Sequence, residues 1–174
     1  MRETTDKAKE YLGYGLSVIP TAKDKTPLLA SWKAYQTTRL KEAEVNKVFG
    51  KAPGLAVICG AVSGGLEVID VDTKYDLTGS LWDELRAIIK DSLPELYERL
   101  VIAQSQSGGY HIYYRCKDPG GNVKLAERET TPGERGYNPK DKVRVLIETR
   151  GEGGYIIAPP TPGYSYVQGD PQKI

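Results

Sequence analysis

Two carboxylates stand two residues apart in the segment LEVIDVDTK, at Asp70 and Asp72. The segment is rich in β-branched residues, and residues two apart on a strand point to the same face, so both acids should converge on one small volume. Two carboxylates that close repel each other, and one takes up a proton unless a cation lies between them. Oxygen ligands of this kind suit Mg²⁺ or Mn²⁺, although acids at a strand end that faces solvent need no metal.

A third acid, Glu148, interrupts the apolar segment RVLIETR. An ionised carboxylate on an otherwise apolar face needs a cationic partner or a metal, and Arg150 on the same face could supply the first. Together with Asp70 and Asp72, Glu148 would complete a set of three acids, enough to hold two divalent ions. Such a pair of ions activates an attacking oxygen and stabilises a leaving oxygen in phosphoryl transfer.

The single histidine, His111, lies in QSQSGGYHIYY, four residues after Ser107. The paired glycines Gly108 and Gly109 predict a tight turn whose backbone N–H groups can face an anion. Ser107 and His111 would add side-chain donors near that turn, although an ordinary hairpin has the same sequence pattern. Lys25, in the loop TAKDKTPLL, is a further candidate for binding phosphate, against the commoner case of a solvated loop lysine.

Three more groups of residues have weaker claims. Lys23 shares the loop of Lys25 and could meet the same phosphates, and Arg150 could pair with phosphate oxygens instead of with the acids. The tyrosines of the strand after the glycine turn could stack a base or a sugar, although one face of that strand must be core. These are Tyr110, Tyr113 and Tyr114, with Arg115 beside them.

The elements that must position these residues can be read from the apolar patterns. We expect helices over residues 5–16, 40–49 (with Thr38 as its N-cap) and 80–90, the last with an apolar stripe that packs in the core. We expect strand pairs in which GLAVICG and LEVIDVD flank the turn AVSGG, LVIAQS and HIYYRC flank QSGGY, and RVLIETR and GGYIIAPP flank GEG. The polar stretch 117–142 is expected to be a long excursion or a mobile loop.

This order predicts an α+β fold, in which an N-terminal helix-and-strand portion packs on a mostly antiparallel sheet. The 174 residues fit a single domain, 1–174, that can also be divided into two lobes at about 1–53 and 54–174. The net charge of +1 does not indicate a nucleic-acid partner, so any polyanion would need a local basic surface.

The composition also restricts the setting. Two cysteines without a CxxC pair argue against a cysteine zinc site and favour a reducing, cytoplasmic location. The charged start MRETTDKAKEY lacks the apolar run of a signal peptide, and no apolar stretch approaches the roughly 20 residues of a membrane span. We therefore expect no membrane partner.

In order, IDVD, SGGYH and the IE of LIETR resemble the three motifs of the archaeo-eukaryotic primase superfamily. The likeness is closest to the bifunctional primase-polymerase (prim-pol) domain found in plasmids, phages and mobile elements. The flanking segments GLSVIPTAKDKTPLLASW, LAVICGAVSGG and GEGGYIIAPPTPGYSY are also similar to that family. The resemblance runs from about residue 15 to residue 166, nearly the whole chain.

The resemblance implies roles for these positions and for the sheet. Asp70, Asp72 and Glu148 match the metal ligands, and Ser107 and His111 match the motif that contacts the phosphates of the incoming nucleotide. The sheet would be RRM-like and would carry the active site. The implied activity is a DNA primase/polymerase that adds nucleotides from nucleoside triphosphates to a 3′-hydroxyl on a single-stranded or primed DNA template.

The chain departs from the wider superfamily in lacking a zinc module and a Walker sequence, so we expect it to be a domain excised from a longer protein. In that longer protein, the resemblance implies a helicase or a helical accessory segment as a partner. In some relatives such a helical segment is needed to start a primer.

Two other functions use the same residues. A metal-dependent nuclease could use the paired acids but has no triphosphate for the SGGYH turn to hold. A non-catalytic nucleic-acid-binding module would place three acids against the phosphates it binds.

Overall fold

The computed structural model describes residues 2–138 and 140–174, with the side chain of Arg2 left out. Two antiparallel sheets and five α-helices make up this part of the chain, which confirms the α+β expectation. The helices are α1 (Arg2–Gly13), α2 (Glu42–Phe49), α3 (Leu81–Ser92), α4 (Pro94–Tyr97) and α5 (Pro132–Tyr137). The strands are β1 (Ser17–Thr21), β2 (Gly54–Ile58), β3 (Leu66–Val71), β4 (Val101–Gln104), β5 (Tyr110–Arg115), β6 (Lys124–Glu129), β7 (Val143–Arg150), β8 (Tyr155–Ala158) and β9 (Ser165–Gln168).

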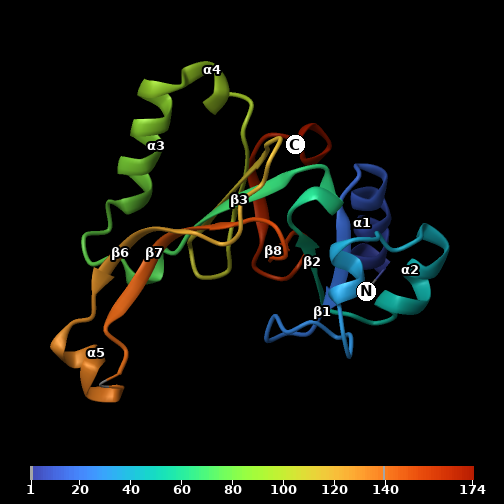
Figure 1. Cartoon of the computed structure of the whole chain (residues 1–174), viewed down its shortest axis with the longest axis horizontal. Helices are drawn as coiled ribbons and strands as arrows, with labels where there is room; N and C mark the ends of the chain where they lie inside the picture. Colours follow the sequence, from blue (N-terminus) through green and yellow to red (C-terminus); the bar gives the residue numbers. More distant parts are fainter. Residues whose placement is uncertain (1, 139) are drawn as a thin grey trace.

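The smaller sheet has the order β1-β2-β8 and lies with α1 and α2 at one end of the molecule (Figure 1). Both β1 and β2 are buried along their whole length, which explains why they read as short continuous apolar runs in the sequence. Tyr11 of α1 and Val45 of α2 are completely buried in the same core cluster as β2. Burying side chains of this size contributes about 1.5–3 kcal/mol each.

The larger sheet has the order β6-β7-β3-β5-β4-β9, and all its pairings are antiparallel. One face packs on the core that the smaller sheet and α1 share, through Val68 and Tyr113. The opposite face carries Ile69 and Ile112 and is covered by α3 and α4. Because side chains alternate along a strand, Asp70 lies on the face of Val68, toward the smaller sheet.

Two of the three expected strand pairs are wrong. LVIAQS and HIYYRC do pair, as β4 and β5, but β2 and β3 belong to different sheets and are joined only by an isolated bridge between Gly60 and Leu66. The segment between them forms a 3-10 turn, and Gly60 (φ 97°) and Gly64 (φ 70°) take the left-handed backbone that redirects the chain. In the same way the loop after β7 leads out of the larger sheet, so β7 and β8 do not pair.

Of the two alternatives for 117–142, the mobile loop is wrong, because this excursion contains β6 and α5. Strand β6 has the sequence KLAERE and is mostly exposed, so it is held by pairing with β7 and by ion pairs rather than by apolar burial. Composition alone therefore could not reveal it. The N-cap of α2 is Lys41, not Thr38, and the stripe of α3 is only half-buried, with Ile88 62% exposed.

Residues on both sides of the boundary at 53 share one hydrophobic core, since Tyr11 and Val45 join Leu66 and Val101 in a single cluster. Across residues 2–138 and 140–174, no helix combines the length and the apolar content that crossing a membrane requires.

Candidate active site

Strand register brings the sequence motifs together around Asp70. In the antiparallel ladder, Asp70 of β3 lies directly opposite His111 of β5 on one side and Glu148 of β7 on the other. Directly opposite side chains on one face are close neighbours, so the three motifs meet on a single face of the larger sheet. Asp72 follows the end of β3, and its backbone N–H donates to the carbonyl of Leu146 in β7.

Each of the three acids has a cation beside it. The guanidinium of Arg150 pairs with Glu148 (2.5 Å) and lies 3.7 Å from Asp70, and the Lys74 ammonium lies 2.8 Å from Asp72. The arginine partner that the sequence offered for Glu148 is therefore present. In the described part of the chain, no three His, Cys, Asp or Glu side chains are grouped closely enough to hold a metal ion.

Burial raises the pKa of the Asp70 carboxyl above its ordinary value, against the opposing effect of Arg150, and the negative charge of Asp72 adds to the increase. A carboxyl in this environment is stabilised in its charged form by added positive charge. All three side chains offer hard oxygen atoms, which are the ligands that Mg²⁺ and Mn²⁺ prefer. The chemistry of these oxygen atoms suits a divalent cation, and Asp70, Asp72 and Glu148 are the residues that would hold it, although in this structure their side chains pair with Arg150 and Lys74 and are not grouped as a metal site.

The acids line a cavity of about 430 Å³ between the two sheets. Of the residues singled out in the sequence, the structure brings seven to its wall and leaves out Gly108, Gly109, Lys23, Tyr110, Tyr113, Tyr114 and Arg115. The seven at the wall are Lys25, Asp70, Asp72, Ser107, His111, Glu148 and Arg150. A wall that combines carboxylates with cationic and polar donors suits a ligand that carries phosphates together with a metal.

His111 is only 4% exposed, and its Nε2 atom lies 3.5 Å from a carboxylate oxygen of Asp70. Burial lowers the pKa of His111 to about 4, so the ring is neutral at pH 7. Its Nδ1 atom is buried without a hydrogen-bond partner among the described residues, while an interaction of the ring with the backbone of Ile157 opposes the effect of burial and raises the pKa. A neutral ring beside Asp70 can donate one hydrogen bond to a bound ligand.

This burial has a consequence for stability in the metal-free protein. In the unfolded chain His111 titrates near 6.5, whereas in the folded chain its pKa is about 4. Below pH 6.5 the unfolded state binds a proton that the folded state does not, so stability should fall by about 3 kcal/mol as the pH decreases from 6.5 to 4. Urea unfolding in EDTA at a series of pH values should show a shallower decline for His111→Gln, and equal declines in the two proteins would contradict the assignment.

Lys25 reaches the cavity from a tight turn between β1 and η1 (Lys33–Gln36). Its φ of 73° is the one positive value among the non-glycine residues described, and a backbone N–H to Ala22 closes the turn. Residues held in this region of the backbone are concentrated at ligand sites. The Lys25 ammonium lies 5.5 Å from the ring centroid of Tyr164, while Lys23 is exposed and lines a neighbouring cavity of about 200 Å³.

The glycine turn joins β4 to β5 and holds Ser107 at the cavity wall. Gly108 has a φ of 84°, as the tight turn required. Glycine is also required at Gly109 because an added Cβ would lie 2.3 Å from the Val71 carbonyl oxygen. The anion-binding role of the turn's backbone N–H groups stays a prediction. The absence of a side chain at Gly109 lets the turn pack against the end of β3, next to the acids.

The tyrosines after this turn have structural places. Tyr113 is 2% exposed and lies in the main core. Tyr110 stacks on Trp82 of α3 (centroids 3.9 Å apart), and the Tyr114 hydroxyl donates to Glu67, both on the sheet face opposite the cavity. Arg115 donates to backbone carbonyls, including that of Ile174. Stacking of a base by these residues is therefore not supported.

Several residues of the cavity wall were not predicted from the sequence. Lys74 stands two residues after Asp72, and this spacing from the paired acids could have indicated that it lies at the cavity wall. Tyr155 and Trp32 pack edge to face (centroids 5.2 Å apart) and form an aromatic part of the wall. Asn122 lies in the stretch expected to be a loop, and its side-chain oxygen accepts from the Gly151 N–H.

The family comparison agrees with the geometry. The sequence model of the bifunctional DNA primase/polymerase, N-terminal domain, matches residues 8–172. The chain belongs to this family. The match extends over nearly the whole chain, so the resemblance drawn from three short motifs is confirmed, and the activity of this Prim-Pol domain is nucleotidyl transfer of the primase/polymerase type, which uses nucleotides and a DNA template. Among curated proteins, none matches the chain.

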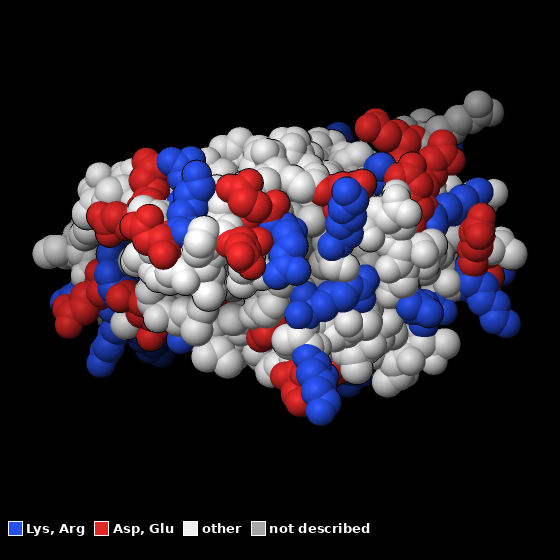
Figure 2. All heavy atoms as spheres, turned by 90° about the horizontal axis from the view of Figure 1, so that it is seen from above, with Lys and Arg blue, Asp and Glu red and all other residues white. Residues whose placement is uncertain are grey.

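The charges of the Prim-Pol domain are mixed over the face that Figure 2 shows, where acidic and basic side chains alternate over short distances. This agrees with the net charge of +1. Contact with a polyanion would therefore depend on individual cations such as those of the cavity, and less on a broad basic surface.

Proposed function

We propose that this domain catalyses template-directed addition of nucleotides from nucleoside triphosphates to a 3′-hydroxyl, with two Mg²⁺ or Mn²⁺ ions held by Asp70, Asp72 and Glu148. The observation that carries the proposal is the register around Asp70, which joins all three motifs at one cavity. Bound there, divalent ions would supply activation of the 3′-hydroxyl and neutralisation of the departing pyrophosphate.

The other residues of the cavity would bind and orient the triphosphate. Ser107 and neutral His111 can donate hydrogen bonds, and Lys25 brings positive charge to the same wall. Arg150 is held between Glu148 and Asp70, and its planar guanidinium can bind two phosphate oxygens at once. These donors lie on the same cavity wall as the acids, so they could bind the phosphates next to the metal ions.

Primer extension tests this proposal. Purified residues 1–174, with a fluorescent primer annealed to a longer template, nucleoside triphosphates and Mn²⁺, should give products longer than the primer. EDTA should abolish them, because the acids would then lack their ions. Shortening of the primer would identify a nuclease instead, and an unchanged primer despite tight DNA binding would leave only a binding module.

A further inference from the structure

Strands β6 and β7 extend beyond the rest of the larger sheet and are connected by α5. Together the three elements form an arm that projects from the body of the molecule (Figure 1). We define the arm as residues 124–138 and 140–145. Its own ladder runs from Lys124 to Glu129 on β6, paired with β7. The side chains of the arm are mostly polar, so ion pairs rather than a hydrophobic core must fix its shape.

Glu134 of α5 is the centre of these ion pairs. It accepts two hydrogen bonds from the Arg128 guanidinium (2.8 and 2.9 Å), one from Arg144 (3.3 Å) and one from the backbone N–H of Thr131 (2.7 Å). The bonds from Arg128 hold the pKa of Glu134 far below its ordinary range, so the carboxylate stays ionised. Arg128 and Arg144 have side chains only 16% and 17% exposed, and both are thus held in one geometry.

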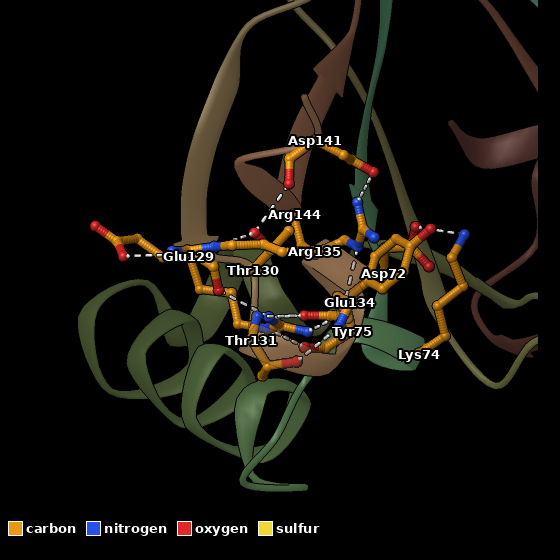
Figure 3. Close-up of polar contacts among 11 residues, drawn as sticks. Asp72, Lys74, Tyr75, Glu129, Thr130, Thr131, Glu134, Arg135, Asp141 and Arg144 are labelled. Atoms are coloured by element: carbon orange, nitrogen blue, oxygen red, sulfur yellow. Dashed lines mark hydrogen bonds and ion pairs between the residues drawn. The ribbon is translucent and has the colours of Figure 1, made fainter. Parts of the chain in front are cut away.

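The same two arginines also contact a segment outside the arm. Figure 3 shows Arg144 and Glu134 of the arm together with Tyr75 of that segment. The Nε of Arg128 donates to the backbone carbonyl of Tyr75 (2.6 Å), and the Arg144 guanidinium lies 5.2 Å from the centroid of the Tyr75 ring. Tyr75 ends the 3-10 turn η3 (Thr73–Tyr75), which follows Asp72 directly. The backbone N–H of Tyr75 donates to the Asp72 carbonyl (3.3 Å).

Asp72 itself lies past the end of β3 and depends on this turn for its position. The backbone N–H of Asp72 donates to the carbonyl of Leu146. The turn η3, which follows Asp72, has no buried residue that could fix it by packing. Lys74 contacts both ends of the segment from Asp72 to Tyr75. Its ammonium pairs with Asp72 (2.8 Å) and lies 4.6 Å from the Tyr75 ring centroid. The arm therefore clamps the turn that carries one of the three acids.

We propose that Arg128, Glu134 and Arg144 are positioning residues that hold the Asp72–Tyr75 turn in the conformation needed to bind a divalent ion. The inference rests on the proposed function for the role of Asp72. Residues that orient a ligand from behind typically contribute about 10- to 100-fold to metal affinity or activity. A freer turn would let the Asp72 carboxylate move away from Asp70 and Glu148, and less of the protein would be ready to bind the ion.

The arm provides a matched control in Arg135. Like Arg128, it is an arginine of the arm that pairs with a glutamate, but its bonds go to Glu129 and Thr130, both within the arm. Arg135→Ala should therefore loosen the arm without releasing Tyr75. Arg128→Ala removes the hydrogen bond to the turn as well as the ion pair with Glu134.

Hydrogen exchange of the metal-free protein tests the clamp without any reference to catalysis. In Arg128→Ala the amides of Tyr75 and Asp76, which close the turn, should exchange about tenfold faster than in wild type, and in Arg135→Ala they should not change. Glu134→Gln, which removes the shared charge but keeps an oxygen acceptor, should act in the same direction as Arg128→Ala. Unchanged exchange in Arg128→Ala, or equal acceleration in Arg135→Ala, would overturn the clamp.

Titration with Mn²⁺, followed by electron paramagnetic resonance, tests the consequence for the ion. Affinity should fall about 10- to 100-fold in Arg128→Ala, remain at the wild-type value in Arg135→Ala, and recover in part in Arg128→Lys. Faster exchange with unchanged Mn²⁺ affinity would refute the positioning role. If wild type binds no Mn²⁺, the proposed function fails and the positioning role with it, whereas the exchange result on the clamp stands by itself.

Discussion

Primer extension should stop when Asp70 is changed to Asn, although the variant folds. Asp70 lies between Glu148 and His111, so all the proposed ligands depend on it for a common site. A metal ion supplies several kcal/mol of charge stabilisation to the transition state, and each 1.36 kcal/mol corresponds to a factor of ten in rate. We expect a loss of roughly a thousandfold or more, measured as the initial rate of single-nucleotide addition at saturating Mn²⁺. Extension at the wild-type rate would exclude Asp70 as a ligand.

The same change should not weaken the metal-free fold. Burial raises the pKa of Asp70, so the folded chain holds this proton more tightly than the unfolded chain, and the contribution of Asp70 to stability falls as the pH rises above about 3.9. In EDTA at pH 7, Asp70→Asn should melt at or above the wild-type temperature. Added Mn²⁺ should raise the melting midpoint of wild type but not that of Asp70→Asn. Asp83→Asn, which removes an exposed acid paired with Arg86 on α3, is the matched control and should respond to Mn²⁺ like wild type.

Changing His111 to Ala should weaken triphosphate binding while the primed template still binds. The neutral ring lies at the cavity wall beside Asp70, and a lost hydrogen bond to a charged group costs about 1–3 kcal/mol, or about 5- to 150-fold in affinity. Calorimetric titration of a nucleoside triphosphate in the presence of Mn²⁺ measures the change.

Two comparisons make this result specific. Lys23→Ala removes a cation that lies outside the main cavity, so its triphosphate affinity should match that of wild type. Binding of primed DNA without nucleotide should be equal in all three proteins. Unchanged triphosphate affinity in His111→Ala would remove His111 from the proposed binding site.

The sequence predicts strands wherever a segment has a buried face, because that face requires apolar residues. The strands β3, β4, β5 and β7 were recognised because their buried faces require β-branched or aromatic residues. Partners of the strands were predicted less well, since a glycine turn such as residues 60–65 can close a hairpin or lead the chain into a second sheet. Strand β6 was missed because pairing with β7 and ion pairs stabilise it, and neither leaves an apolar pattern.

The candidate site was predicted more fully than the fold. Asp70, Glu148 and His111 were each singled out as residues of unusual type in an apolar context, and the structure places them opposite one another. Side chains such as Asn122 and Trp32 were missed, because they enter the wall from distant segments whose neighbours only the tertiary structure defines. At Gly109 the sequence could not reveal the close approach of the Val71 carbonyl, which also requires glycine there.

The central position of β3 makes the site sensitive to errors in strand alignment. A slip of one residue against either neighbour would turn Ile69 and Val71 toward the cavity and Asp70 toward the apolar face under α3. A misaligned chain could keep most of its secondary structure and still fail to bring Asp70 together with Glu148 and His111. After refolding from denaturant, the fraction of molecules that bind Mn²⁺ would thus count the chains whose sheet has assembled with the native alignment, which circular dichroism alone cannot distinguish.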